Sequence, residues 1–265
     1  MSRSSVNDQL NTDTLRRALG EVGRAFSLHV FSELDSTNSE AKRLAVAQGA
    51  VPALIVAEGQ TAGRGRMGRS FYSPADTGVY FSILFEAGGA MEHALSITSA
   101  ASVAVMRAIR RLCRKQCAIK WVNDLYLDGK KVCGILTEAI SGTEGAPKIV
   151  VGIGINLCTG EFPPDLQSKA GSLGERELSR AALIAAVVQE LLPYLNDPTD
   201  DSWLSDYRAH SCVIGRPITW VRAEQAFSGV ATGIDGRGGL EVELPDGSSD
   251  CLRTGEISVF IEQWR

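Results

Sequence analysis

The feature that most constrains the fold of this chain is a run of three strand-like segments near its middle. The first two, 118–127 and 131–140, are separated by Asp128-Gly129, a dipeptide that favours a tight hairpin turn. The third, 148–157, is rich in valine and isoleucine, which favour strands. Because a hairpin brings its two arms side by side in opposite directions, this run predicts antiparallel pairing of at least the first two strands.

Helical patterns lie on both sides of this run. Small and apolar residues recur on one face of 94–113, which predicts a long amphipathic helix. Further helices are predicted at 10–19, 39–48, 179–195 and 203–209, and further strands at 29–34, 53–57 and 78–85. Helices and strands therefore both contribute to the main body of the protein.

The sequence changes in character after residue 212. The segments that follow are short strands separated by glycine-rich turns, at 217–221, 226–234, 240–244 and 257–261. Short strands at this spacing indicate a small β-barrel. We therefore expect three parts: an N-terminal extension at 1–27, a main domain at 28–212 and a barrel at 213–265.

The composition excludes some classes of function. The net charge is −4, so there is no global basic field that would hold a nucleic acid. The N-terminus lacks the apolar core of a signal peptide, and the chain has no apolar run of the ~20 residues that span a bilayer. We expect a cytoplasmic protein that does not bind a membrane, with its six cysteines reduced and without a metal ion.

The segment Gly63–Arg69 stands out against this acidic background, because it carries three arginines separated by glycines. Arginine presents a planar set of donors to carboxylate and phosphate oxygens, and glycine lets the backbone approach a ligand closely. We interpret the segment as a loop that closes over an anionic small molecule. A solvated basic loop and an RNA-binding Arg-Gly segment are the alternatives.

Three other segments carry residues that suit a ligand site. In Lys120–Asp124, lysine and asparagine suit phosphate oxygens and aspartate suits a metal ion on those phosphates; a structural ion pair is the alternative. One of Lys130 and Lys131 is expected to point inward after the hairpin, although both could be solvated. Gly152 and Gly154 fall on one face of a strand, which leaves room for a flat ligand or for a closely packed helix.

The order and spacing of these segments resemble the motif set of the bacterial biotin–protein ligases. The motifs that carry the resemblance are Asp35-Ser36-Thr37-Asn38, Gln60–Arg69, Lys120–Asp124, Lys130–Leu136 and Gly152–Asn156, with Gly255–Ser258 similar to the family's C-terminal barrel. The resemblance runs from about Phe31 to the C-terminus. It implies an α+β fold of the class II synthetase-like biotin/lipoate ligase type. Such a fold has a central mixed β-sheet with helices on one side, followed by an SH3-like β-barrel.

The same resemblance implies a monofunctional ligase. Biotin would be activated with ATP and Mg²⁺ to biotinyl-5′-AMP. The biotinyl group would then pass to one lysine of a biotin carboxyl carrier protein, a subunit of a biotin-dependent carboxylase. Some relatives also carry an N-terminal DNA-binding domain, but only about thirty residues precede the catalytic region here, so we expect no specific DNA binding. A monomer and a homodimer are both compatible with the sequence.

Residue roles follow from the resemblance position by position. Lys131 and Arg66 would be catalytic, Asp124 would hold Mg²⁺, and Phe71 takes a position where the family often has tryptophan. The residues that would bind biotin are Ser36, Thr37, Asn38, Gln60, Gly63, Arg64, Gly65, Arg66, Lys131, Gly134 and Gly152. Those that would bind ATP are Arg66, Arg69, Phe71, Lys120, Asn123, Asp124 and Asn156.

The chain departs from the family pattern at two positions of these motifs. Val122 replaces the family's usual proline, and Met67 replaces a common basic residue. Ser36 and Thr37 precede a predicted helix, so capping that helix is the structural alternative for both. A lipoate–protein ligase would share the fold and the adenylate chemistry, but the complete Gly-Arg-Gly-Arg-x-Gly-Arg loop favours biotin. The acidic balance argues against a nucleic-acid-binding protein, and the polar strand motifs argue against a pure interaction module.

Overall fold

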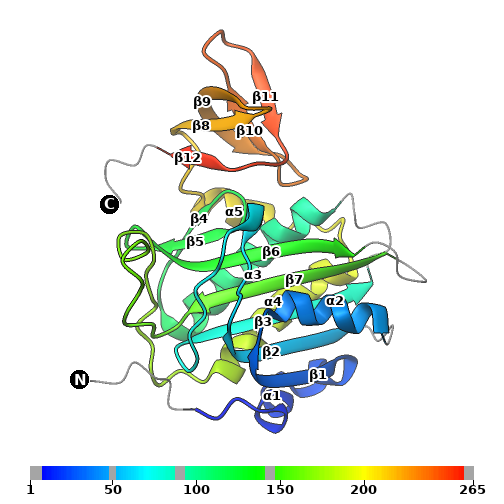
Figure 1. The fold of residues 1–265 in the computed structure, drawn as a ribbon. Coiled ribbons are helices and arrows are strands. Elements are labelled where there is room, and N and C mark those ends of the chain that lie inside the picture. Colours follow the sequence, from blue (N-terminus) through cyan, green and yellow to red (C-terminus); the bar gives the residue numbers. More distant parts are fainter. Residues whose placement is uncertain (1–7, 48–51, 87–92, 141–146, 260–265) are drawn as a thin grey trace.

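The main body of the protein is a mixed seven-stranded β-sheet (Figure 1). The computed structural model describes residues 8–47, 52–86, 93–140 and 147–259. The strands are ordered β1-β2-β3-β7-β6-β5-β4; β1 and β2 run parallel, and the other neighbours run antiparallel. Their bounds are β1 Ser27–Leu34, β2 Ala53–Gln60, β3 Gly78–Glu86, β4 Ala118–Lys120, β5 Asp124–Leu127, β6 Lys130–Ile140 and β7 Lys148–Asn156. The predicted hairpin at Asp128-Gly129 is confirmed as the turn between β5 and β6.

Helices cover both faces of this sheet, so the expectation of helices on one side is wrong. The helices are α1 Thr12–Leu19, α2 Thr37–Ala47, α3 Ala94–Cys113, α4 Arg180–Asn196 and α5 Leu204–His210, with 3₁₀ turns at Gly20–Ala25 and Arg66–Gly68. Leu84 and Val150 pack with α2 in one cluster, whereas Ile83 and Val151 pack in the main core with α3 and α4. Because successive strand residues point to opposite faces, α2 lies on the face opposite α3 and α4.

The segment 118–127 forms two strands, so the prediction of a single strand is wrong. β4 and β5 pair antiparallel across a turn at 121–123. The carbonyl oxygen of Val122 in this turn accepts hydrogen bonds from the hydroxyl groups of Ser102 and Tyr207, each at 3.2 Å. These donors on α3 and α5 are distant in the sequence, so the local apolar pattern could not report the break.

The N-terminal segment packs onto the main domain. Leu15 and Leu19 of α1 are buried in the main core, and α1 contacts α4. Asp8 binds the buried Arg180 at the start of α4, with 2.7 Å between Asp8 Oδ1 and Arg180 Nε. The described residues of the N-terminal extension therefore share the core of the domain that follows.

The C-terminal part is a five-stranded antiparallel sheet beside the β4 edge of the main sheet (Figure 1). Its strands, ordered β11-β10-β9-β8-β12, are β8 Pro217–Arg222, β9 Gln225–Ile234, β10 Leu240–Glu243, β11 Ser249–Leu252 and β12 Ile257–Val259. The strand β11 was not predicted, because it begins with serine and aspartate, which are typical of turns. The indole Nε1 of Trp121 donates to the carbonyl oxygen of Gly238 at 2.9 Å, which joins this sheet to the β4–β5 turn.

No helix in the described part of the chain is long and apolar enough to cross a membrane.

Candidate active site

A groove crosses β7, β6 and β5 on the face of the sheet that carries α2. One end, which we call the α2 end, is lined by Ser36, Thr37, Asn38, Gln60, Gly152, Ile153 and Gly154. The other, which we call the turn end, is lined by Gly65, Arg66, Met67, Arg69, Ser70, Lys120, Trp121, Asn123, Asp124, Lys131, Ile135, Glu256 and Ile257. Arg64, Phe71, Gly134 and Leu136 line both ends. Most of the residues predicted to bind biotin or ATP therefore meet in one groove.

The α2 end is a buried network of neutral hydrogen-bonding groups. The backbone N–H of Thr37 donates to Gln60 Oε1 at 2.9 Å, and Gln60 Nε2 donates to Ser73 Oγ at 2.8 Å. The hydroxyl oxygen of Ser82 lies 2.6 Å from Asn38 Oδ1 and 2.7 Å from Thr37 Oγ1. Buried polar groups that are all hydrogen-bonded hold one another in a single arrangement.

Glu138 on β6 joins this network to two cations. Its Oε2 accepts a hydrogen bond from Asn38 Nδ2 at 2.9 Å, and its Oε1 lies 2.8 Å from Lys42 Nζ and 3.3 Å from an Arg64 guanidinium nitrogen. Burial raises the pKa of Glu138, but hydrogen bonds from Lys42 and Asn38 outweigh it and hold the pKa below its ordinary value of 4.5. The carboxylate is therefore ionised at neutral pH. The sequence analysis did not identify Glu138, because one acidic residue in a strand carries no local signal.

Glycines on adjacent strands leave space that two other side chains fill. Gly134 of β6 and Gly154 of β7 are direct cross-strand partners, and the ring of Phe71 lies against both. A Cβ atom at Gly154 would lie 2.6 Å from Phe71 Cε1, and one at Gly152 would lie 2.0 Å from Asn38 Oδ1. The glycine pattern predicts space for a flat ligand or a closely packed helix. In the structure Asn38 and Phe71 occupy it.

The loop Gly63–Arg69, which we call the arginine lid, folds back on itself over the groove. Backbone hydrogen bonds join Gly65 N to Arg69 O at 2.7 Å and Phe71 N to Gly63 O at 2.8 Å. Gly63 itself does not line the groove. A Cβ atom there would lie 2.4 Å from Phe71 O, so glycine at 63 permits the two arms of the lid to approach closely.

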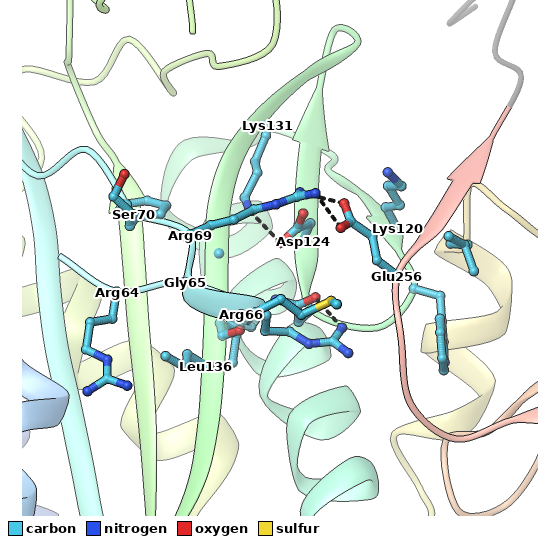
Figure 2. A pocket seen from close by; sticks show the side chains of 17 residues that line it. Arg64, Gly65, Arg66, Arg69, Ser70, Lys120, Asp124, Lys131, Leu136 and Glu256 are labelled. Atoms are coloured by element: carbon cyan, nitrogen blue, oxygen red, sulfur yellow. Dashed lines mark hydrogen bonds and ion pairs between the residues drawn. The ribbon is translucent and has the colours of Figure 1, made fainter. Parts of the chain in front are cut away.

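Two lid arginines bind the segment just before β12, and Figure 2 shows one of these contacts, the ion pair of Arg69 with Glu256. Arg66 donates to Asn123 Oδ1 at 3.1 Å and to the carbonyl oxygen of Gly255 at 2.7 Å. Arg69 pairs with Glu256 at 2.5 Å. Burial lowers the pKa of Arg66, because the guanidinium loses hydration. Glu256 was absent from the predicted site, since its motif indicated only the barrel.

Charged side chains of opposite sign meet at the turn end. Lys131 Nζ lies 2.7 Å from Asp124 Oδ1, and Lys120 is the cross-strand partner of Asp124 (Figure 2). Lys130 lies outside the groove, where its Nζ donates to the carbonyl oxygen of Gln167 at 3.1 Å. Of the two neighbouring lysines, Lys131 is the one that faces the groove.

Asn156 is a second predicted ligand residue that, like Gly63, does not line the groove, whereas Ser36 lines it and also begins a helix. Asn156, at the end of β7, does not line the groove; its Nδ2 donates to Gly171 O at 2.9 Å, and its buried Oδ1 has no hydrogen-bond partner in the described part of the chain. Ser36 lines the groove and also precedes α2, where its carbonyl oxygen accepts the N–H of Glu40 at 3.0 Å.

The cysteines play no visible part in the site. All six are free thiols, which agrees with the prediction of reduced cysteines. Burial raises the pKa of Cys133 well above its ordinary value and that of Cys212 to about 11, so neither is a ready nucleophile. The described residues contain no cluster of three or more His, Cys, Asp or Glu side chains suited to a metal ion.

Two family models match the chain. Residues 30–156 match the biotin/lipoate A/B protein ligase family, and residues 213–259 match the biotin protein ligase C-terminal domain. The chain therefore belongs to the biotin protein ligase family.

Particular relatives agree with this class. The chain is 32% identical to the biotin--[acetyl-CoA-carboxylase] ligase of Paracoccus denitrificans, over 82% of this chain and 95% of that protein. It is 31% identical to the bifunctional ligase/repressor BirA of Bacillus subtilis (strain 168), over 81% of this chain and 68% of that protein. Among solved structures, the Aquifex aeolicus biotin protein ligase in complex with biotin and ATP has a TM-score of 0.74 and 27% identity, and the match covers 88% of this chain and 98% of that one.

Proposed function

We propose that the groove binds biotin at its α2 end and ATP at its turn end. The observation that carries this proposal is that a set of neutral hydrogen-bonding groups and a set of cations line one groove and share Phe71 and Gly134. The ureido ring of biotin exchanges neutral hydrogen bonds, whereas the phosphates of ATP need cations. The carboxylate of biotin and the α-phosphate would meet between the two ends, beneath the arginine lid.

The protein is a biotin–protein ligase, so the chemistry has two steps. In the first, a carboxylate oxygen of biotin attacks the α-phosphorus of ATP, the bond to pyrophosphate breaks, and biotinyl-5′-AMP forms. In the second, a lysine amine attacks the acyl carbon, AMP leaves, and the new amide nitrogen loses a proton. Neither step requires a covalent bond to the enzyme, in agreement with buried thiols that are poor nucleophiles.

Lys131 and Arg66 would serve the first step by reducing the repulsion between two anions. Preorganised cations aimed at developing negative charge are a large source of rate enhancement. Lys131 pairs with Asp124 at 2.7 Å, so phosphate binding would exchange that pair for contacts with the reacting oxygens. Arg66 is held between Asn123 and Gly255, a position that suits a cation over the groove.

The donor set at the turn end fits a magnesium ion that arrives with ATP. Mg²⁺ is commonly held by one or two carboxylates together with substrate phosphates. Asp124 supplies one carboxylate there, and its Oδ1 is buried with no hydrogen-bond partner other than the ion pair to Lys131 in the described structure. The ion would neutralise part of the phosphate charge.

The acceptor of the biotinyl group is the carrier protein of a carboxylase. We propose that it is one lysine of a biotin carboxyl carrier protein and that this lysine enters beneath the arginine lid. The lid would exclude water from the adenylate until then, which protects a reactive mixed anhydride.

One experiment separates this function from that of a lipoate ligase. The protein should exchange labelled pyrophosphate into ATP when biotin is present and should not do so with lipoate. Mass spectrometry of a carrier protein incubated with enzyme, ATP and biotin should reveal one added biotinyl group. Exchange that depends on lipoate and not on biotin would reject the assignment.

A further inference from the structure

Glu138 stands behind the proposed biotin site rather than in it. It does not line the groove, yet it contacts Asn38, Lys42 and Arg64. Its side chain is 17% exposed, so these contacts are largely shielded from water. A residue placed in this way acts on the ligand through another side chain.

The carboxylate of Glu138 determines which way the amide of Asn38 points. An ionised carboxylate only accepts hydrogen bonds, as does the carbonyl oxygen of Leu136. Asn38 Nδ2 lies 2.9 Å from Glu138 Oε2 and 3.2 Å from Leu136 O, so it directs one hydrogen to each. The reversed amide would place its oxygen against two acceptors. Asn38 Oδ1 is therefore turned the other way, toward Ser82.

The orientation of the Asn38 amide also determines the direction of the hydrogen bonds at Ser82 and Thr37. Because Asn38 Oδ1 cannot donate, the single hydroxyl hydrogen of Ser82 must point to it across their 2.6 Å separation. The hydroxyl of Thr37 then donates to Ser82 Oγ at 2.7 Å or to Gln60 Oε1 at 3.3 Å. In either case neither Thr37 nor Asn38 retains a side-chain hydrogen for a ligand, and lone pairs on their oxygens remain.

We propose that Glu138 is a positioning residue for ligand specificity: it holds Asn38 so that this wall of the groove accepts hydrogen bonds and selects a ring that carries N–H donors. The proposal rests on the proposed biotin site. The ureido ring of biotin has two N–H groups, whereas the dithiolane ring of lipoate has none. A lipoate ring would bury the remaining lone pairs of the Thr37 and Asn38 oxygens without offering a donor, which disfavours lipoate.

A double-mutant cycle with direct ligand binding tests the route through Asn38. The dissociation constant for biotin is measured by calorimetry on the full chain, wild type, Glu138→Ala, Asn38→Ala and the double variant. Glu138→Ala should weaken biotin binding about tenfold or more, the cost of losing a hydrogen bond to a charged group. In the Asn38→Ala background the same change should weaken binding by less than about twofold, because coupled residues are not additive. If the loss of biotin affinity in the double variant equals the product of the losses in the two single variants, the proposal is overturned.

The cycle is repeated with Arg64→Ala, since Glu138 also contacts Arg64. Glu138→Ala could weaken biotin binding in the Asn38→Ala background but not in the Arg64→Ala background. That result would show that Glu138 acts through Arg64, and it overturns the proposal. Glu138→Gln provides a second variant of nearly the same shape. It should fall between wild type and Glu138→Ala in biotin affinity, because an amide can still accept from Asn38 but no longer attracts the cations.

Glu190→Ala is the matched control. Glu190 lies near Arg107 and Arg111, at 4.0 and 3.4 Å, and is 24% exposed, but it is remote from the groove. It should lose stability without a change in biotin affinity. Inhibition by lipoate of biotin-dependent pyrophosphate exchange should rise in Glu138→Ala relative to Glu190→Ala, and an unchanged ratio overturns the specificity role. A wild type that exchanges pyrophosphate with lipoate alone rejects the function itself, which separates that failure from failure of the role of Glu138.

Discussion

The two ends of the groove are built from different interactions. At the α2 end, Thr37, Asn38 and Ser82 are buried and hydrogen-bonded to one another. At the turn end the groups are charged and more exposed: the side chain of Lys131 is 32% exposed and that of Arg69 is 67% exposed. The α2 end is held mainly by buried neutral hydrogen bonds, with the Glu138 carboxylate behind them, and the turn end is held by ion pairs between partly exposed side chains.

This difference suggests different tasks for the two ends: one selects the acid that is activated, and the other exchanges protein carboxylates for phosphate. The side chains of a buried, hydrogen-bonded network are already fixed before the ligand binds. Binding therefore loses little free energy to the ordering of these side chains. An ion pair between exposed side chains is worth only about 0–1 kcal/mol, so phosphate can replace a protein carboxylate at little cost. We therefore expect the α2 end to determine which acid is activated, and the turn end to change partners during the reaction.

Lys131→Ala provides the largest test of the turn end. Pyrophosphate exchange should fall by roughly 100-fold or more, as on loss of one preorganised donor at a developing anion. Biotin affinity should change far less, because the α2 end is intact. The control is Lys130→Ala, which removes the neighbouring lysine that faces away from the groove and should leave exchange near normal. Near-normal exchange in a folded Lys131→Ala protein would exclude a catalytic role.

Arg66→Gly tests the arginine lid. Arg66 holds the lid to Asn123 and to the carbonyl oxygen of Gly255, so its loss removes both of these hydrogen bonds and leaves the ion pair of Arg69 with Glu256. The adenylate should then escape and label bystander lysines, with biotinylation of an unrelated protein rising on the order of tenfold, the worth of one charged hydrogen bond. Protease cleavage within 63–69 should also increase. A variant that is inert, or that remains specific with an equally protected lid, contradicts this function of the lid.

Glu256→Gln tests whether phosphate replaces a protein carboxylate at the turn end. In the structure the carboxylate of Glu256 forms an ion pair with Arg69, a cation proposed to bind phosphate. Removing that competitor should lower the KM for ATP by a factor of about 2–5, the scale of an exposed ion pair, and the KM for biotin should not change. The effect should shrink as salt is added, since salt screens exposed pairs. An increase in the KM for ATP would mean that Glu256 supports the nucleotide site instead of competing with it.

The pH dependence of stability provides the smallest test, at the α2 end. Glu138 faces Lys42 and Arg64 and has a pKa below its ordinary 4.5 in the folded protein. A depressed carboxyl pKa contributes stability above the ordinary value, and that contribution is lost as the pH falls through the lowered pKa. The stability advantage of wild type over Glu138→Gln should therefore be constant near neutral pH and shrink below about pH 4.5. Urea unfolding at several pH values measures it, and an advantage that grows toward acid contradicts the ion-pair assignment.

Much of the architecture was predictable because it depends on local periodicity. The long helix over 94–113 was predicted with the bounds that α3 has. The hairpin at Asp128-Gly129 was recognised because its residues favour that turn. The errors lie where distant contacts override the local pattern, as at 121–123, or where a strand such as β11 lacks strand-forming residues.

The sequence by itself determined the kind of chemistry. The glycines and arginines of the lid, the lysine after the hairpin and the carboxylate of the β4–β5 turn are set by residue type and order, and these carry the family's motifs. Such signals lie within short segments, where neighbours in the chain are neighbours in space.

Only the tertiary structure decided the partners of those residues. Glu138 meets Asn38 across 100 positions, and Arg66 meets Gly255 across 189. No local pattern encodes such pairs. They form only when helices pack on the two faces of the main sheet and the C-terminal sheet packs beside its β4 edge. The orientation of the Asn38 amide, and with it the hydrogen-bonding character of the proposed biotin wall, follows from that packing.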